Sequence, residues 1–158
     1  MEQATFGAGC FWKTEDVFRR VTGVMATSVG YMGGHFPNPS YLDVVARITG
    51  HAEVAQIEYD PDKVSYEELL AVFWNMHDPT SLNRQGADRG EQYRSVIFFH
   101  TPQQRLIAQK SKQQLQMSGK YDRAIVTEIK PALEYYLADL EHQQYLEKKR
   151  KRDKANTF

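Results

Sequence analysis

The sequence predicts an α+β protein in which helices pack against one sheet. Short apolar stretches with the two-residue period of strands alternate along the 158 residues with longer stretches of helical period. Several predicted strands follow one another through loops, which favours α+β over a regular series of strand–helix–strand units. No internal repeat or linker-like segment interrupts the pattern, and the length suits one compact domain with a real core.

The N-terminal half is predicted from periodicity and from helix-boundary signals. Val17, Phe18 and Val21 recur at helical spacing. Ser65 followed three residues later by Glu68 matches a capping box at the start of the clearest helix. The elements expected here are strands at 3–9, 24–31 and 53–59, helices at 13–21 and 65–77, and a loop at 33–40.

The C-terminal half begins with a long polar segment, residues 78–92, which shows no periodicity and is expected to be an irregular, functional loop. Further on we expect strands at 93–100 and 125–129, a helix at 102–117 with proline at its start, and a helical or irregular segment at 137–148. We expect one folded domain over residues 1–147 and a basic, flexible tail over residues 148–158.

Composition excludes several classes of protein. Hydrophobic residues make up 41% and charged residues 25%, with 20 basic and 20 acidic residues, so overall charge favours neither a nucleic-acid nor a membrane partner. We expect no secretory leader and no membrane span. A single cysteine rules out a disulfide framework and fits a reducing compartment, so we expect a cytoplasmic protein, and we expect it to be a monomer.

Cys10 is the only cysteine, and it lies where a short apolar strand is predicted to turn into a helix. A helix N-terminus favours the thiolate, which is the nucleophilic form. Gly9 allows close backbone approach, and the two aromatic residues Phe11 and Trp12 are candidates to form a dry pocket beside the sulfur. A free cysteine is also a common inert core residue, so sequence position alone leaves both interpretations open.

Glu53 opens an otherwise apolar strand in the segment Gly50-His51-Ala52-Glu53-Val54. A glutamate facing solvent is the simpler interpretation. If the side chain instead faces the pocket of Phe11 and Trp12, burial would raise its pKa. A carboxylic acid that stays neutral near pH 7 can donate a proton.

Other residues give weaker signals. Tyr31, Tyr41 and Tyr93 lie beside loops, and converging phenols would clamp a substrate oxygen, but their spacing does not show convergence. The five histidines show no metal-ligand spacing, and no second cysteine can join them.

An ordered series of motifs resembles the peptide methionine sulfoxide reductase A family over about residues 6–146. One four-residue motif would be weak, whereas the ordered series is specific. The motifs are Gly9-Cys10-Phe11-Trp12, Gly30-Tyr31-Met32-Gly33-Gly34, Asn38-Pro39-Ser40-Tyr41, Thr49-Gly50-His51-Ala52-Glu53-Val54, His77-Asp78-Pro79-Thr80, Asn83-Arg84-Gln85-Gly86, Gln92-Tyr93-Arg94-Ser95 with Asp88 and Gly90 before it, and His142-Gln143-Gln144-Tyr145-Leu146.

The resemblance implies roles for five polar residues. Cys10 would attack the sulfoxide sulfur and Glu53 would protonate the sulfoxide oxygen. Tyr41 and Tyr93 would hydrogen-bond that oxygen, and Asp88 would organise the polar side of the site. The products would be methionine and a cysteine sulfenic acid.

The resemblance also implies that Phe11 and Trp12 form the apolar pocket for the substrate's S-methyl group. It implies the S epimer of methionine sulfoxide, free or in peptides and proteins, and no bound cofactor or metal. The implied fold is a two-layer α/β plait related to the ferredoxin-like sandwich.

The chain departs from many relatives, which carry resolving cysteines near the C-terminus or directly after the tryptophan. Lys13 occupies that second position here, and no other cysteine exists. Any oxidised Cys10 must therefore be reduced from outside, by glutathione with glutaredoxin or by thioredoxin, as a transient partner.

Two rival functions stay open at this point. A cysteine hydrolase or acyl transferase would need a histidine base, for which His51 or His142 could be nominated. A non-catalytic domain would bind oxidised methionine or a protein partner without turnover.

Overall fold

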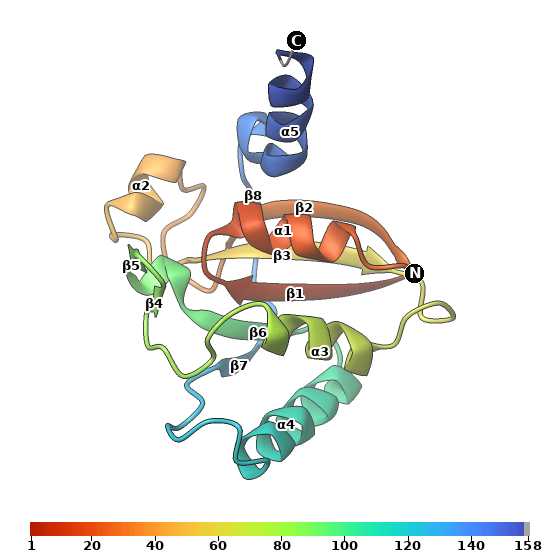
Figure 1. Cartoon of the computed structure of the whole chain (residues 1–158). Coiled ribbons are helices and arrows are strands. Elements are labelled where there is room, and N and C mark those ends of the chain that lie inside the picture. The colour runs from red at the N-terminus through yellow and green to blue at the C-terminus, as the bar shows by residue number, and fades with distance from the viewer. Residues whose placement is uncertain (157–158) are drawn as a thin grey trace.

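The computed structural model describes residues 1–156, and its centre is a six-stranded sheet in the order β7-β6-β1-β3-β2-β8 (Figure 1). Neighbouring strands are antiparallel except β6 and β7, which are parallel. The strands are β1 (Glu2–Ala8), β2 (Val24–Met32), β3 (Ala52–Tyr59), β6 (Ser95–Phe99), β7 (Glu128–Pro131) and β8 (Tyr136–Leu137).

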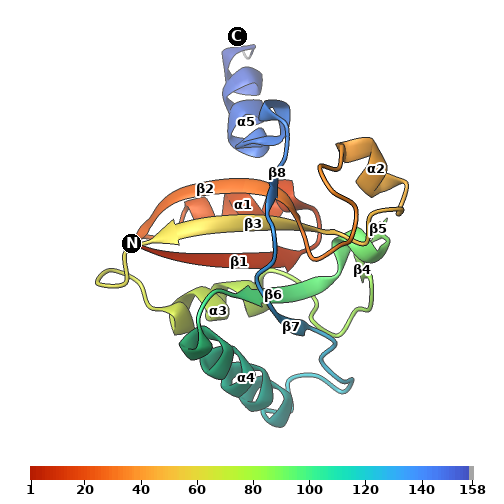
Figure 2. The same cartoon turned by 180° about the vertical axis from the view of Figure 1, so that it is seen from behind.

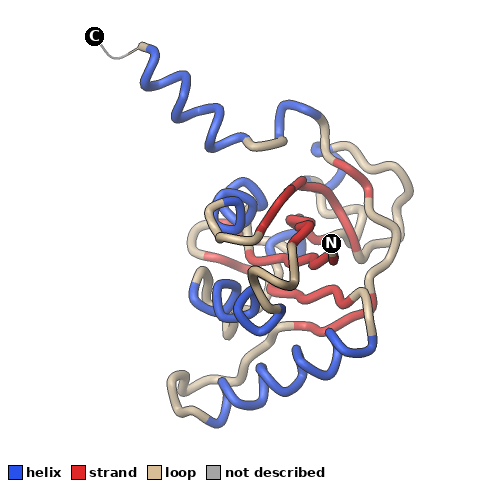
Figure 3. Tube along the Cα trace, turned by 90° about the vertical axis from the view of Figure 1, so that its right-hand side faces the viewer, coloured by secondary structure: helices blue, strands red, loops and turns tan. Residues whose placement is uncertain are grey.

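Helices α1 and α3 cover one face of the sheet, whereas the chain between β7 and β8 crosses the other face (Figures 2 and 3). The helices are α1 (Phe11–Arg19), α2 (Tyr41–Val45), α3 (Tyr66–Asn75), α4 (Pro102–Met117) and α5 (Tyr145–Ala155). The α+β fold class predicted from the sequence is thus confirmed. Within residues 1–156, none of the helices combines the length and the apolar character that a membrane span requires.

Stacked aromatic rings hold α1 and α3 on the sheet. Phe6 of β1 lies between Phe18 of α1 and Phe73 of α3, with ring centroids 4.9 and 5.2 Å apart, and all three side chains are fully buried. A second apolar cluster under the start of α1 contains Phe11 and Tyr31. The first cluster fixes the layers, and the second forms the base of the region described below.

Local sequence signals predicted the start of the central helix α3 correctly. Ser65 and Glu68 form the predicted capping box at the start of α3. The segment 78–92 is not wholly irregular, because it contains a hairpin of β4 (Arg84–Gln85) and β5 (Asp88–Arg89). The 3₁₀ helix η1 (Glu91–Tyr93) follows, so Tyr93 precedes β6 rather than opening it.

The strand expected at 125–129 is displaced, because the parallel pairing with β6 sets its register and places β7 at Glu128–Pro131. The segment 137–148 is not one helix. It begins in β8, paired with β2, continues through the 3₁₀ helix η2 (Leu140–His142), and only then enters α5.

The basic segment that follows is described as far as residue 156, and residues 157 and 158 lie outside the described part of the chain. Residues 148–155 form the greater part of α5. Arg150 from this part of the helix makes an ion pair with Asp16 of α1, at 2.7 Å. The domain boundary proposed at residue 147 therefore falls inside a helix.

Gln143 joins the C-terminal segment to the edge of β2. Its side-chain oxygen accepts from the backbone N–H of Val29 at 2.8 Å, and its amide nitrogen donates to the carbonyls of Val29 at 2.8 Å and Ala138 at 2.9 Å. The side chain is buried, so these bonds replace water for the backbone groups that they join.

We expect Gln143→Met to lower the free energy of unfolding by about 1–3 kcal/mol, because a buried backbone N–H is left without a partner. Denaturant unfolding measures the loss, and hydrogen exchange at the Val29 amide should accelerate. Gln109→Met, on the exposed face of α4, is the matched control and should change stability by less than about 0.5 kcal/mol. Equal stability of the two variants would contradict the role of Gln143.

Candidate active site

Cys10 follows β1 and occupies the N-cap position of α1. Gly9 makes the turn between them with φ +95°, a left-handed conformation that favours glycine. A Cβ at Gly9 would lie 3.0 Å from Cβ of Gln85, so the β4–β5 hairpin packs directly against this turn. The thiol is half-buried, as the sequence prediction of a reactive strand-to-helix thiol requires.

The thiol of Cys10 is protonated in the resting protein at neutral pH. Its pKa is raised to about 11, mainly by burial and also by the negative charges of Glu53 and Asp88. The backbone N–H groups of Trp12 and Lys13, at the start of α1, lower it. The helix N-terminus acts in the predicted direction, but burial outweighs it, so the nucleophilic thiolate must form during a reaction.

Glu53 does not face solvent. It lies in β3 with 1% of its surface exposed, and its Oε1 accepts from the backbone N–H of Phe11 at 3.2 Å. Its Oε2 has no hydrogen-bond partner within residues 1–156. Burial raises the pKa of the carboxyl to about 8; the bond from Phe11 lowers it and the charge of Asp88 raises it. At neutral pH the group is mainly a carboxylic acid with a proton to give.

Tyr41, Tyr93 and Asp88 come from three other segments. Tyr41 is the first residue of α2, Tyr93 ends η1, and Asp88 lies exposed in β5. The pKa of Tyr93 is raised to about 12, mainly by burial and also by the charges of Glu53, Tyr41, Asp88 and Cys10. Burial raises the pKa of Tyr41 as well, with contributions from Glu53, Cys10 and Asp88. The fold therefore brings all five predicted polar residues within electrostatic reach of one another.

A surface of ring side chains, here called the aromatic wall, lies beside the thiol and consists of Phe11, Trp12, His142 and Tyr145. Phe11 is fully buried, while Trp12 is half-buried and stacks on Tyr145 with ring centroids 3.9 Å apart. The indole N–H of Trp12 donates to Nδ1 of His142 at 3.1 Å, and the His142 ring lies 4.5 Å from that of Tyr41. This wall offers an apolar, rigid surface to a small non-polar group near Cys10.

Sequence analysis considered Tyr31 as a candidate phenol and His142 as a base for the rival hydrolase. The family resemblance gave no role to His142 or Tyr145, nor to Tyr31, which packs against Phe11 with ring centroids 5.6 Å apart. The motif His142-Gln143-Gln144-Tyr145 carried the signal for His142 and Tyr145. Its role could not be assigned from sequence, because the contact with Trp12 spans 130 residues.

Within residues 1–156, neither histidine nominated for the hydrolase alternative makes a hydrogen bond to Cys10. Nδ1 of His51 accepts from the backbone N–H of Gly34 at 2.8 Å, and its Nε2 lies 2.8 Å from the carbonyl of Phe36. With Nδ1 as an acceptor, Nε2 donates, so both ring nitrogens serve the loop. Nδ1 of His142 is occupied by Trp12.

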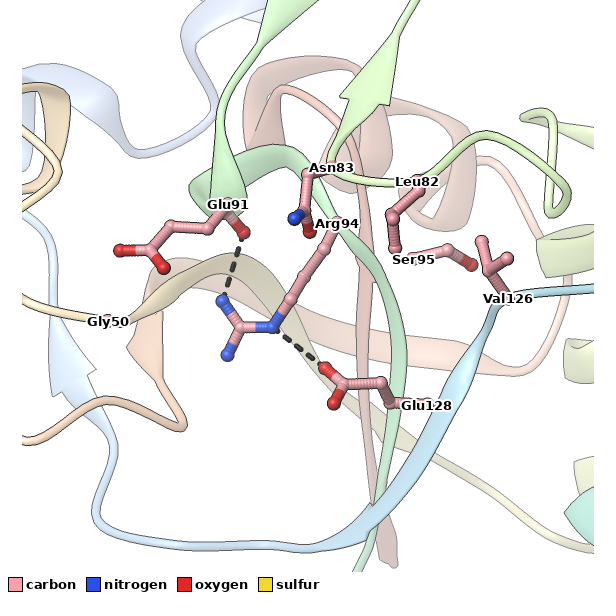
Figure 4. A pocket seen from close by; sticks show the side chains of 8 residues that line it. All are labelled: Gly50, Leu82, Asn83, Glu91, Arg94, Ser95, Val126 and Glu128. Atoms are coloured by element: carbon pink, nitrogen blue, oxygen red, sulfur yellow. Dashed lines mark hydrogen bonds and ion pairs between the residues drawn. The ribbon is translucent and has the colours of Figure 1, made fainter.

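A pocket of about 400 Å³ lies elsewhere, and none of the predicted site residues lines it (Figure 4). Arg94 crosses it, donating to Glu128 at 2.9 Å and to the carbonyl of Glu91 at 2.9 Å. The remaining lining residues are Gly50, Leu82, Asn83, Ser95 and Val126. With an internally paired arginine between acidic residues, this pocket is not the candidate active site.

Comparison with known proteins identifies the family to which the chain belongs. The family model described as peptide methionine sulfoxide reductase matches residues 2–157. Peptide methionine sulfoxide reductase MsrA 1 of Nostoc sp. is 71% identical over 152 residues, covering 96% of this chain and 93% of that protein.

Solved structures agree with the sequence comparison. Mxr1 from Saccharomyces cerevisiae in its reduced form superposes with a TM-score of 0.87 at 36% identity, covering 93% of this chain and 84% of that one. Mxr1 in complex with Trx2 superposes with a TM-score of 0.64 at 28% identity, covering 91% and 84%. The chain therefore belongs to the peptide methionine sulfoxide reductase A family, and it is an oxidoreductase that reduces methionine sulfoxide.

Proposed function

We propose that this protein reduces the S epimer of methionine sulfoxide, free or in proteins, through a sulfenic acid on Cys10. The observation that carries the proposal is the pairing of a half-buried thiol with Glu53, a buried acid whose Oε2 has no hydrogen-bond partner among the described residues. Sulfoxide sulfur is a poor electrophile until its oxygen is protonated, so an acid and a thiol are needed on different atoms of the same group.

In the proposed first step the protons balance between Glu53, Cys10 and the substrate, and no further reactant is needed. Glu53 gives its proton to the sulfoxide oxygen, Cys10 attacks the sulfur, and the carboxylate takes up the thiol proton. Tyr41 and Tyr93 donate hydrogen bonds to the oxygen as it becomes negative, and Asp88 orders the polar side. Oxygen then passes to Cys10: the substrate sulfur is reduced by two electrons, the cysteine sulfur is oxidised by two, and methionine leaves.

Phe11 and Trp12 hold the substrate's S-methyl group in this proposal. The aromatic wall supports that role, because Trp12 is fixed on two sides, by the hydrogen bond to His142 and by the stacking of Tyr145. An immobile wall keeps the sulfur within reach of Cys10 and the oxygen within reach of Glu53, and such positioning makes a large contribution to rate.

The second step needs an outside thiol, since the chain has one cysteine. One thiol displaces water from the sulfenic acid to give a mixed disulfide, and a second thiol releases Cys10. The complex of the similar yeast Mxr1 with Trx2 supports thioredoxin as the donor, with glutathione and glutaredoxin as the alternative. The protein would act as a cytoplasmic monomer, with the catalytic residues inside the 1–147 domain.

Purified protein with dithiothreitol should convert the S epimer of a methionine sulfoxide peptide to methionine and leave the R epimer unchanged. Cys10→Ser should abolish this conversion, because the hydroxyl cannot accept the oxygen. Chromatographic quantification of methionine measures both. Residual turnover by Cys10→Ser would remove the nucleophile assignment, and failure of the wild type on both epimers would favour a binding domain.

Glu53→Gln should lower kcat by about 10²–10⁴, the usual contribution of a general acid. Wild-type activity should fall as pH rises through about 8, when the acid ionises. The variant should lose that fall, and its thiol should be alkylated at lower pH, because the charge of Glu53 no longer raises the pKa of Cys10. Glu58→Gln, exposed on the same strand, is the control.

The pH dependence of the free energy of unfolding gives a second test of Glu53→Gln. The folded pKa of Glu53 is raised from its ordinary value of 4.5 to about 8, so the folded state binds more protons than the unfolded state within that window. The contribution of Glu53 to stability therefore declines from pH 4.5 to 8, and the difference in stability between the wild type and Glu53→Gln should follow this decline. Denaturant unfolding across this range measures the difference. Parallel pH profiles for the two proteins would show that Glu53 is not a buried neutral acid.

Thioredoxin with its reductase and NADPH should sustain turnover. A thioredoxin that lacks its second cysteine should accumulate as a mixed disulfide on Cys10, because nothing in this chain can resolve it. Mass spectrometry detects the adduct, and a sulfenic-acid probe should label one site per chain in the absence of thiol. Turnover that requires a disulfide-linked dimer of this chain would overturn the external-donor scheme.

A further inference from the structure

Two buried polar oxygens near the thiol have no hydrogen-bond partner within residues 1–156: the hydroxyl of Tyr31 and Oε2 of Glu53. Each residue has only 1% of its surface exposed. Buried polar atoms are rarely left unpaired, and the exceptions call for a specific reason. The active-site roles described above account for Oε2 of Glu53 but leave the hydroxyl of Tyr31 without a function.

The two residues are directly opposite in the sheet. In the antiparallel pairing of β2 with β3, Tyr31 is the register partner of Glu53. Opposed residues point to the same face of a sheet with their Cβ atoms about 4.5–5.5 Å apart. Both also contact the first residue of α1: the Tyr31 ring packs on Phe11, and Glu53 accepts from the Phe11 N–H.

Electrostatics agree with this placement. Burial raises the pKa of Tyr31, and the charge of Glu53 is the largest of the neighbouring charges that raise it further. The hydroxyl therefore stays protonated at any pH at which the enzyme works, and it remains a donor. The other charges that act on it come from Tyr41, Asp139 and Glu141.

We propose that Tyr31 is a positioning residue whose hydroxyl donates a hydrogen bond to the Glu53 carboxylate that exists transiently after the proton has passed to the sulfoxide oxygen. No proton leaves Tyr31. The neutral acid has its own proton and needs no second donor. Within residues 1–156 the carboxylate has the Phe11 N–H as its one donor, so the bond from Tyr31 forms when the charge forms. A donor that stabilises only the ionised state favours proton release at the transition state.

The inference rests on the proposed reductase chemistry, and Tyr31→Phe tests it. This variant keeps the ring that packs on Phe11 and removes only the hydroxyl. We expect kcat to fall about 10- to 100-fold, the rate equivalent of a hydrogen bond to a charged group, with little change in KM. The pH at which activity declines should rise above that of the wild type, because the ionised form of Glu53 has lost a donor.

Tyr66→Phe is a matched control. Tyr66 is also buried, at 5% exposure, and its hydroxyl also lacks a partner, but it belongs to the Phe6 cluster away from Cys10. Removing an unpaired buried hydroxyl should leave both variants at least as stable as the wild type. Tyr66→Phe should keep the wild-type kcat and pH profile. A difference in kcat between the two variants would therefore arise from the location of the Tyr31 hydroxyl opposite Glu53, and not from the loss of a buried hydroxyl as such.

A readout without turnover separates this inference from the proposed function. Titration of the Glu53 carboxyl in ¹³C-glutamate-labelled protein should give a higher pKa in Tyr31→Phe than in the wild type. The other ionisable groups acting on Glu53 and Cys10, among them Asp88, are unchanged between the two proteins. An unchanged Glu53 pKa together with unchanged kcat would overturn the role of Tyr31 while leaving the reductase assignment intact.

Discussion

The burial of the Glu53 carboxyl against the first turn of α1 is the constraint on which the site depends. A single backbone bond, from the N–H of Phe11 at 3.2 Å, ties β3 to the residue that follows Cys10. That bond fixes the acid beside the thiol, and burial keeps the acid protonated. The left-handed turn at Gly9 completes the arrangement, because it brings the end of β1 and the start of α1 to the same point.

A comparison with Glu15 shows what distinguishes Glu53. Both glutamates have 1% of their surface exposed. The carboxylate of Glu15 accepts from Oγ1 of Thr27 at 2.8 Å and from the backbone and side-chain nitrogens of Gln144 at 2.7 and 2.8 Å. Glu15 therefore serves as a fully bonded anchor between α1, β2 and the C-terminal segment. In the described part of the chain, Glu53 has one donor and an oxygen without a hydrogen-bond partner, which is the arrangement of a reactive group rather than a structural one.

Sequence analysis succeeded where the determining interactions are local. The capping box of Ser65 and Glu68 spans three residues and could be read directly, and the strand-to-helix turn at Cys10 depends on neighbouring residues. It failed at β7 and at the β8–α5 segment, where pairing with β6 and β2 sets the boundaries. Periodicity contains no information about a partner strand that lies many residues away.

The difference between local and long-range interactions applies to the candidate site as well. The residue types at Cys10 and Glu53 indicated a thiol and an acid, but their proximity is a property of the sheet and of the Phe11 bond. The raised thiol pKa could not be predicted either, because the helix N-terminus lowers it while burial, which only the fold reveals, raises it more. The family motifs supplied the roles through resemblance and assigned none to Tyr31, whose significance lies in its register against Glu53.

The single cysteine and its surroundings impose an order on the proposed reaction. Cys10 is half-buried at the start of α1, and Gln85 of the hairpin packs against the neighbouring Gly9 turn. In the proposed scheme the sulfoxide and the reducing thiol both react at this one sulfur atom, because the chain has a single cysteine. Because the oxygen remains on Cys10 as sulfenic acid after methionine departs, the two need never be present together. The proposed chemistry thus favours a ping-pong sequence in which the first product leaves before the reductant enters.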